Sequence, residues 1–131
     1  VVVKGVLRAD DARRAVQAGA AAIWVSNHGG RQLDRAVATP IALRQVVSAV
    51  GPGAEIYVDG GIRNGLDTLA ARAAGARGVF LGRLPLFALA AFGDVGVQTA
   101  LERMNLELSE ALTLSGCATL TEVPGILFEG S

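Results

Sequence analysis

The sequence has 131 residues, of which 51% are hydrophobic and 18% are charged, and its formal net charge at pH 7 is zero. A chain of this length can bury a modest core of its own, and this composition excludes an intrinsically disordered protein. The balanced charge argues against electrostatic binding of nucleic acid, because such proteins carry an excess of Lys and Arg.

Four short apolar runs predict buried strands, at residues 1–3, 21–25, 55–59 and 78–81. One helical segment is predicted between each pair. Asp10 or Asp11 is expected to cap the first helix, Thr39 the second and Asn64 the third. A further helix is expected over residues 97–114, after a short apolar segment at 85–92, and residues 115–131 are predicted to be a tail. Strands that alternate with helices favour βαβ units, a parallel sheet and the α/β class.

Other features bear on the location of the protein. Cys117 is the only cysteine, so no disulfide can form within the chain and a cytoplasmic protein is expected. The longest apolar run, residues 84–92, has about half the length needed to span a bilayer, so no transmembrane segment is expected. The sequence opens at Val1 without a signal peptide or an initiating methionine, and we expect it to begin inside a longer polypeptide.

Residues 26–34 read Ser-Asn-His-Gly-Gly-Arg-Gln-Leu-Asp and contain His28, the only histidine of the chain. They follow the second predicted strand, and ligands bind at the carboxyl ends of strands in parallel α/β proteins. An imidazole can exchange a proton near neutral pH, and the guanidinium of Arg31 can bind a carboxylate through two hydrogen bonds. The spacing alone leaves two interpretations open, because a histidine in a glycine-rich turn is usually solvated or caps the turn.

Glycine-rich loops with an arginine follow the last two predicted strands. The first contains Asp59, Gly60, Gly61 and Arg63, and the second contains Gly82 and Arg83. Glycine lets backbone N–H groups approach an anion closely, and the loops after strands seven and eight of TIM barrels often bind phosphate. Each loop alone could simply join a strand to a helix, but together they favour phosphate binding.

The motif at residues 26–34, together with Lys4-Gly5 and these two loops, resembles the FMN-dependent 2-hydroxy-acid oxidases and dehydrogenases. This family includes glycolate, lactate and mandelate oxidases, and the resemblance covers about residues 1–122. It implies the C-terminal half of a TIM (β/α)8 barrel, with strands five to eight. Residues 1–131 would then form a partial FMN-binding domain that oxidises a small 2-hydroxy acid to the 2-keto acid.

The resemblance also implies roles for individual residues. His28 would be the general base and would contact the substrate, while Arg31 would bind the substrate carboxylate. Lys4 and Ser26 would contact the pyrimidine side of the flavin. Asp59 would accept a hydrogen bond from a ribityl hydroxyl. The phosphate would lie against the remaining residues, which are Gly60, Gly61, Arg63, Gly82 and Arg83. No metal site is expected.

Some features of the family are absent from this sequence. The substrate-binding tyrosines and the aspartate that orients the histidine belong to the first half of the barrel, and Tyr57, the only tyrosine here, lies in mid-strand. Trp24 is expected to pack between barrel and helices. Four strands cannot close a barrel, so we expect the chain to pair with the missing N-terminal half or with a second copy, and to form a homo-oligomer.

On its own, the chain is expected to hold FMN poorly and to turn over little. Two alternatives stay open. One is another FMN- or phosphate-binding barrel, such as a flavin-dependent isomerase. The other is a non-catalytic half-barrel fragment.

Overall fold

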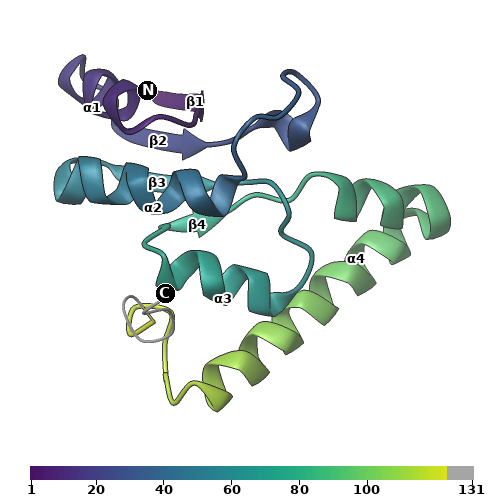
Figure 1. Ribbon diagram of the computed structural model, residues 1–131. Helices are drawn as coiled ribbons and strands as arrows, with labels where there is room; N and C mark the ends of the chain where they lie inside the picture. Colours follow the sequence, from purple (N-terminus) through teal and green to yellow (C-terminus); the bar gives the residue numbers. More distant parts are fainter. Residues whose placement is uncertain (124–131) are drawn as a thin grey trace.

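The computed structural model describes residues 1–123, which form a parallel four-stranded sheet with helices between the strands (Figure 1). The strands lie in chain order across the sheet: β1 (Val2–Val6), β2 (Ala22–Val25), β3 (Glu55–Val58) and β4 (Gly78–Val79). The connecting helices are α1 (Ala9–Gln17), α2 (Thr39–Val50) and α3 (Gly65–Ala73), and α4 (Arg83–Leu114) follows β4. The predicted alternation and the predicted parallel sheet are confirmed.

The hydrophobic core lies between one face of the sheet and helices α1 to α3. Ile23 and Val25 of β2 point to this face and are fully buried, and they pack with residues of the helices that include Leu43 and Val46. Side chains alternate along a strand, so the residues between them point to the other face. There Lys4, Trp24 and Tyr57 are neighbours in the register of β1, β2 and β3, and all three are at least partly exposed. The two faces therefore differ in chemistry.

The first helix begins earlier than predicted. Arg8 is the N-cap residue of α1, so the predicted cap by Asp10 or Asp11 is wrong. Both aspartates lie in the first turn, where a carboxylate interacts favourably with the helix dipole. The Arg8 guanidinium donates to both oxygens of Asp10, at 3.0 and 2.7 Å, and these hydrogen bonds lower the pKa of Asp10 to about 2.

The caps of the next two helices differ from each other. Ala38 is the N-cap of α2, so the predicted cap by Thr39 is wrong: the Thr39 hydroxyl instead donates to the carbonyl oxygen of Gly60, at 3.1 Å. Asn64 caps α3 as predicted, since its side chain accepts a hydrogen bond from the backbone N–H of Asp67 at 2.8 Å. Thr39 thus ties the start of α2 to the loop after β3.

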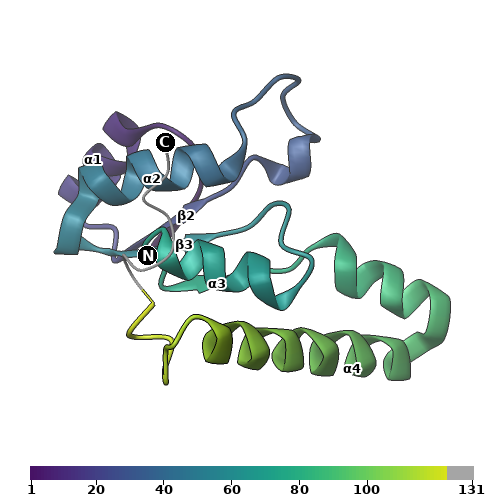
Figure 2. The same ribbon diagram turned by 60° about the horizontal axis from the view of Figure 1, so that its bottom comes forward.

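The helix after β4 starts at Arg83 rather than near residue 97. The predicted apolar segment is its first arm, and the chain reverses at Gly93, whose φ of 65° and ψ of −150° are not helical (Figures 1 and 2). By length and composition α4 is the one helix among residues 1–123 that could cross a membrane. The reversal and the charges of the second arm, including Glu102 and Arg103, do not suit a spanning helix. The absence of a transmembrane segment stays a prediction.

The segment after α4 is part of the packed structure, at least to residue 123. Cys117 and Val123 are buried against Leu69 of α3, and the Arg72 guanidinium donates to the carbonyl oxygen of Leu120 at 2.9 Å. The prediction of a tail is therefore wrong for residues 115–123, because burial there depends on single side chains rather than on a repeating pattern. The rest of that predicted tail lies outside the described residues.

Candidate active site

Apart from Lys4, which lies within β1, the predicted site residues follow the carboxyl ends of β2, β3 and β4. Ser26 follows β2 directly and Asp59 follows β3, and the backbone N–H of Asp59 donates to the carbonyl oxygen of Val25 at 3.1 Å. Lys4 reaches them from β1. Because neighbouring parallel strands end at the same edge of a sheet, residues far apart in the sequence meet here.

Lys4, Ser26 and Asp59 form one polar cluster. The Lys4 ammonium donates to Ser26 Oγ at 2.9 Å and lies 3.0 Å from Asp59 Oδ2. Ser26 is buried, whereas the side chains of Lys4 and Asp59 keep exposed fractions of 36% and 18%. The cluster therefore holds a cation that solvent or a ligand can reach.

Trp24 belongs to this cluster, which the sequence did not predict. Its indole Nε1–H donates to Asp59 Oδ2 at 3.1 Å, and its ring lies 4.7 Å from Lys4 Nζ and stacks on Phe80. The expectation that Trp24 packs between barrel and helices is wrong. Trp24 stands two residues before Ser26, and this alternation places both side chains on the face away from the helices.

The cluster contains buried polar atoms without a partner. Asp59 Oδ1 and Asn27 Oδ1 are buried and accept no hydrogen bond from any residue among 1–123. A buried acceptor without a hydrogen bond destabilises the fold, and a donor that bonds to it removes this penalty. Asp59 therefore has one oxygen in contact with Lys4 and Trp24 and a second, buried oxygen that accepts no hydrogen bond from residues 1–123.

His28 opens the loop after β2, as a short 3-10 turn over His28–Gly30. Its φ is 56°, in the left-handed region that non-glycine residues rarely occupy, and Gly29 and Gly30 continue this conformation. The backbone N–H of His28 donates to Ser26 Oγ at 3.2 Å. Strained backbone of this kind is common at functional sites. The imidazole and the Arg31 side chain are exposed, and neither makes a hydrogen bond within the described chain.

The two glycine-rich loops differ in the donors that they leave free. In the first, Gly60 and Gly61 have positive φ values, but the side chains of Asn64 and Asp67 already occupy N–H groups at the start of α3. In the second, no side chain among residues 1–123 caps α4 at Gly82. The first N–H groups of a helix attract anions when they lack partners. The start of α4, at Arg83, is thus the better anion site.

Arg83 connects this anion site to the histidine loop. Its guanidinium nitrogen Nη2 donates to the carbonyl oxygen of Gly29, at 3.4 Å, and a Cβ added at Gly29 would lie 3.3 Å from the same nitrogen. The structure therefore brings together the predicted residues Lys4, Ser26, His28, Asp59 and Arg83. It places Arg63 at the end of the neighbouring loop, with an exposed side chain.

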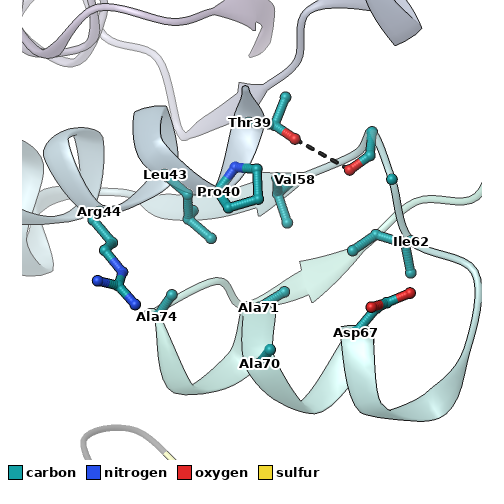
Figure 3. Close-up of a pocket in the computed structure, with 12 residues that line it drawn as sticks. Thr39, Pro40, Leu43, Arg44, Val58, Ile62, Asp67, Ala70, Ala71 and Ala74 are labelled. Atoms are coloured by element: carbon teal, nitrogen blue, oxygen red, sulfur yellow. Dashed lines mark hydrogen bonds between the residues drawn. The ribbon is translucent and has the colours of Figure 1, made fainter. Parts of the chain in front are cut away.

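A cavity of about 190 Å³ lies elsewhere, between α2 and α3 on the helix side of the sheet (Figure 3). Its walls are mostly apolar, with Leu43 and Val58 among them, and Arg44 and Asp67 supply its charges. Gly60 belongs both to the wall of this cavity and to the first glycine-rich loop, and its carbonyl oxygen accepts the Thr39 hydrogen bond drawn in Figure 3. The cavity thus lies behind the first glycine-rich loop, away from His28.

Within residues 1–123, no group of three or more His, Cys, Asp or Glu side chains lies close enough to hold a metal ion. The arrangement offers instead an imidazole and two guanidinium groups, at Arg31 and Arg83, near the partly exposed Lys–Ser–Asp cluster. Such groups can bind carboxylate and phosphate and can move a proton.

The sequence matches the FMN-dependent dehydrogenase family over residues 1–128. It is 50% identical over 123 residues to glycolate oxidase 1 of Oryza sativa subsp. indica, covering 94% of this chain and 33% of that protein. It is 52% identical over 120 residues to 4-hydroxymandelate oxidase of Amycolatopsis orientalis, covering 92% of this chain and 34% of that protein. The chain thus spans about a third of the length of these curated relatives.

Solved structures of mandelate oxidase resemble the fold closely. The complex with benzoyl-formic acid superposes with a TM-score of 0.92 at 50% identity, over 95% of this chain and 37% of that one. A mutant with the monooxide FMN adduct gives the same TM-score and identity, over 95% and 40%. The four parallel strands described above therefore correspond to part of a TIM-barrel oxidase.

Proposed function

Because the chain belongs to the FMN-dependent dehydrogenase family, we propose that it supplies the catalytic base and most of the flavin site of an enzyme that oxidises a small 2-hydroxy acid to the 2-keto acid. The relatives that carry this proposal are named as oxidases of glycolate, lactate and 4-hydroxymandelate. The proposal concerns a whole enzyme of which this chain is the equivalent of about a third.

The proposed reaction removes two protons and two electrons from the substrate; one proton goes to His28, and the other proton and the two electrons would go to the bound flavin. The His28 imidazole takes the proton from the substrate hydroxyl or the α-carbon, a step that general bases accelerate by about a hundred- to ten-thousandfold. The Arg31 guanidinium, three residues later in the same loop, binds the substrate carboxylate and fixes its orientation. Both side chains are exposed and free of partners among the described residues, so a substrate can reach them.

The residues present fit FMN. Asp59 Oδ1 is a buried acceptor without a donor, which suits a ribityl hydroxyl. Lys4 and Ser26 lie beside it and would contact the pyrimidine ring. Arg83 and the free N–H groups at the start of α4 would bind the phosphate, with Arg63 and the glycines Gly60, Gly61 and Gly82 around it. When bound, FMN supplies the acceptor for the two electrons that leave the substrate.

One observation carries the proposal: a single network connects the residues assigned to base, flavin and phosphate. Ser26 Oγ accepts hydrogen bonds from both Lys4 Nζ and the His28 backbone, and Arg83 reaches the next residue, Gly29. If these residues only stabilised the local turns in which they lie, contacts between residues from different strands would not be expected. This convergence supports the proposal that the three groups serve one site.

The rest of the barrel is the proposed partner. Large apolar side chains on the first arm of α4 are exposed, among them Phe87 at 64% and Phe92 at 77%. Several large apolar side chains exposed on one helix arm favour an interaction surface, so we expect them to be covered by the remaining barrel or by further subunits of a homo-oligomer. A cytoplasmic location stays a prediction.

The test is a chimera in which this chain replaces the matching segment of Oryza sativa glycolate oxidase 1. The purified chimera should bind FMN and turn yellow, and glycolate, lactate or mandelate should bleach it anaerobically. FMN binding without bleaching by any hydroxy acid would favour the alternative of another flavin-binding barrel. A folded chimera that takes up no FMN would favour a non-catalytic half-barrel.

A further inference from the structure

Trp24 occupies a place in the site that neither the family motif nor the sequence pattern assigns to it. It lies one position below Ser26 on the same face of the sheet, and it is the only tryptophan in the chain. Its indole contacts the two charged groups of the cluster at once. The ring lies 4.7 Å from Lys4 Nζ, and the Nε1–H donates to Asp59 Oδ2 at 3.1 Å.

The indole determines which oxygen of Asp59 remains free. Oδ2 receives the Trp24 N–H and the Lys4 ammonium, whereas Oδ1 has no donor among residues 1–123. A carboxylate held by Lys4 alone could rotate and present either oxygen, because an ammonium is a point charge without a preferred direction. The indole N–H adds a second, directional contact, which fixes the rotation of the carboxylate.

The indole is itself held in place. Its ring stacks on Phe80 with the centroids 3.7 Å apart and the planes inclined by 18°, and Phe80 meets Tyr57 edge-on at 5.8 Å. Stacked aromatic pairs resist rotation because both rings lose contact area when one turns. The direction of the Nε1–H is therefore set before any ligand arrives.

We propose that Trp24 is a positioning residue for the flavin site: its N–H holds the Asp59 carboxylate so that Oδ1 faces the ribityl chain and Lys4 stays against Ser26. This inference rests on the proposed function, since it assigns a role toward FMN. Trp24 acts only through Asp59 and Lys4 and touches neither substrate nor base. Its loss should therefore change flavin affinity and flavin potential and leave substrate affinity unchanged.

The experiment uses Trp24→Phe in the FMN-loaded chimera, because phenylalanine keeps a ring for Phe80 and Lys4 and removes the N–H. The FMN dissociation constant should rise about tenfold, equivalent to about 1.4 kcal/mol and close to the value of one hydrogen bond to a charged group. The reduction potential of the bound flavin should become more negative, because a displaced Lys4 stabilises the reduced flavin less. The KM for the hydroxy acid should not change.

Tyr57→Phe is the matched control. It removes a polar group from the same aromatic cluster, but the Tyr57 hydroxyl donates to Glu55 Oε2, at 2.7 Å, and not to the site. Its FMN dissociation constant and potential should equal those of the unsubstituted chimera. If Trp24→Phe behaves like Tyr57→Phe, the inference is wrong.

A second comparison separates positioning from general damage to the fold. In a chimera that already carries Asp59→Ala, Trp24→Phe should change the FMN dissociation constant less than twofold, because the acceptor through which the indole N–H acts is then absent. An undiminished effect in that background would assign Trp24 a structural role and overturn the inference.

If Trp24→Phe does not fold, Phe80→Leu carries the same test. This variant loosens the stack and keeps the N–H, so it should raise the dissociation constant to a smaller extent and only when Asp59 is present. No change with Phe80→Leu would then overturn the inference. Failure of the unsubstituted chimera to bind FMN would instead refute the proposed function itself.

Discussion

Replacing Arg72 with methionine should destabilise the chain and release the segment that follows α4. Arg72 is a buried charged residue with an exposed fraction of 8%. Its guanidinium donates three hydrogen bonds to carbonyl oxygens: Ala76 at 2.6 Å, Arg77 at 2.8 Å and Leu120 at 2.9 Å. The first two join α3 to the loop that leads into β4, and the third holds the segment at residues 115–123 against α3.

The size of the effect follows from these bonds and from the cost of burying the charge. A hydrogen bond to a charged group contributes about 1.5–3 kcal/mol, and three would give roughly 4.5–9 kcal/mol if they were additive. Against this stands the desolvation of the guanidinium, which lowers the pKa of Arg72 and costs several kcal/mol. We expect Arg72→Met to lower the free energy of unfolding by about 2–4 kcal/mol.

Two assays measure this. Urea unfolding gives the free energy, and the rate at which a thiol reagent labels Cys117 gives the local opening of residues 115–123. Cys117 is buried and is the only cysteine, so its labelling reports on this segment alone. A loss of 2 kcal/mol corresponds to labelling about 30-fold faster.

The matched control is Arg13→Met, which removes an exposed arginine that has no hydrogen bond or ion pair among the described residues. It should leave both measurements unchanged, within about 0.5 kcal/mol. If Arg72→Met also stays within this limit, the three carbonyl contacts do not stabilise the fold and the reasoning fails.

Three further predictions concern the site and the packing of α4. In the chimera, His28→Ala should keep FMN binding, measured by flavin absorbance, but lose turnover; near-normal turnover would remove His28 as the base. Arg31→Lys should raise the KM for the hydroxy acid, because a point charge replaces a bidentate donor, and an unchanged KM would remove Arg31 from the carboxylate site. Hydrogen bonds from Arg103 and from the Gly65 backbone lower the pKa of Glu107 below 4.5. The stability that Glu107 contributes is therefore present above pH 4.5 and is lost as the pH falls through its lowered pKa. Over that pH range, the urea concentration at the midpoint of unfolding should fall more steeply for the unsubstituted chain than for Glu107→Gln.

The sheet and the position of the site could be predicted because each rests on a local pattern. Apolar runs separated by helical periodicity give a parallel sheet, and in such a sheet all strands end at one edge. His28, Asp59 and Arg83 therefore had to lie near one another once each was assigned to a strand end. No knowledge of individual contacts was needed for this step.

Contacts between distant residues could not be predicted in the same way. Trp24 bonds Asp59, 35 positions away, and Arg72 bonds Leu120, 48 positions away. The hydrophobic periodicity of a helix or strand does not indicate which distant residues will bond each other. The predicted Thr39 cap failed for a related reason, since its hydroxyl donates to the carbonyl oxygen of Gly60, 21 positions away. The first arm of α4 was not predicted as a helix because residues 85–92 are apolar without a clear period, and the reversal depends on two non-helical residues, Phe92 and Gly93.

The alternation of side chains along β2 makes this strand sensitive to insertion. Ile23 and Val25 stabilise the core, while Trp24 and Ser26 serve the site from the other side of the same strand. One extra residue before Ile23 would turn the indole and the serine hydroxyl toward the helices and turn two aliphatic side chains toward the site. Substitutions at Trp24 or Ser26 can alter binding without changing the core. A change in the length of β2 would instead disrupt the core and the site together.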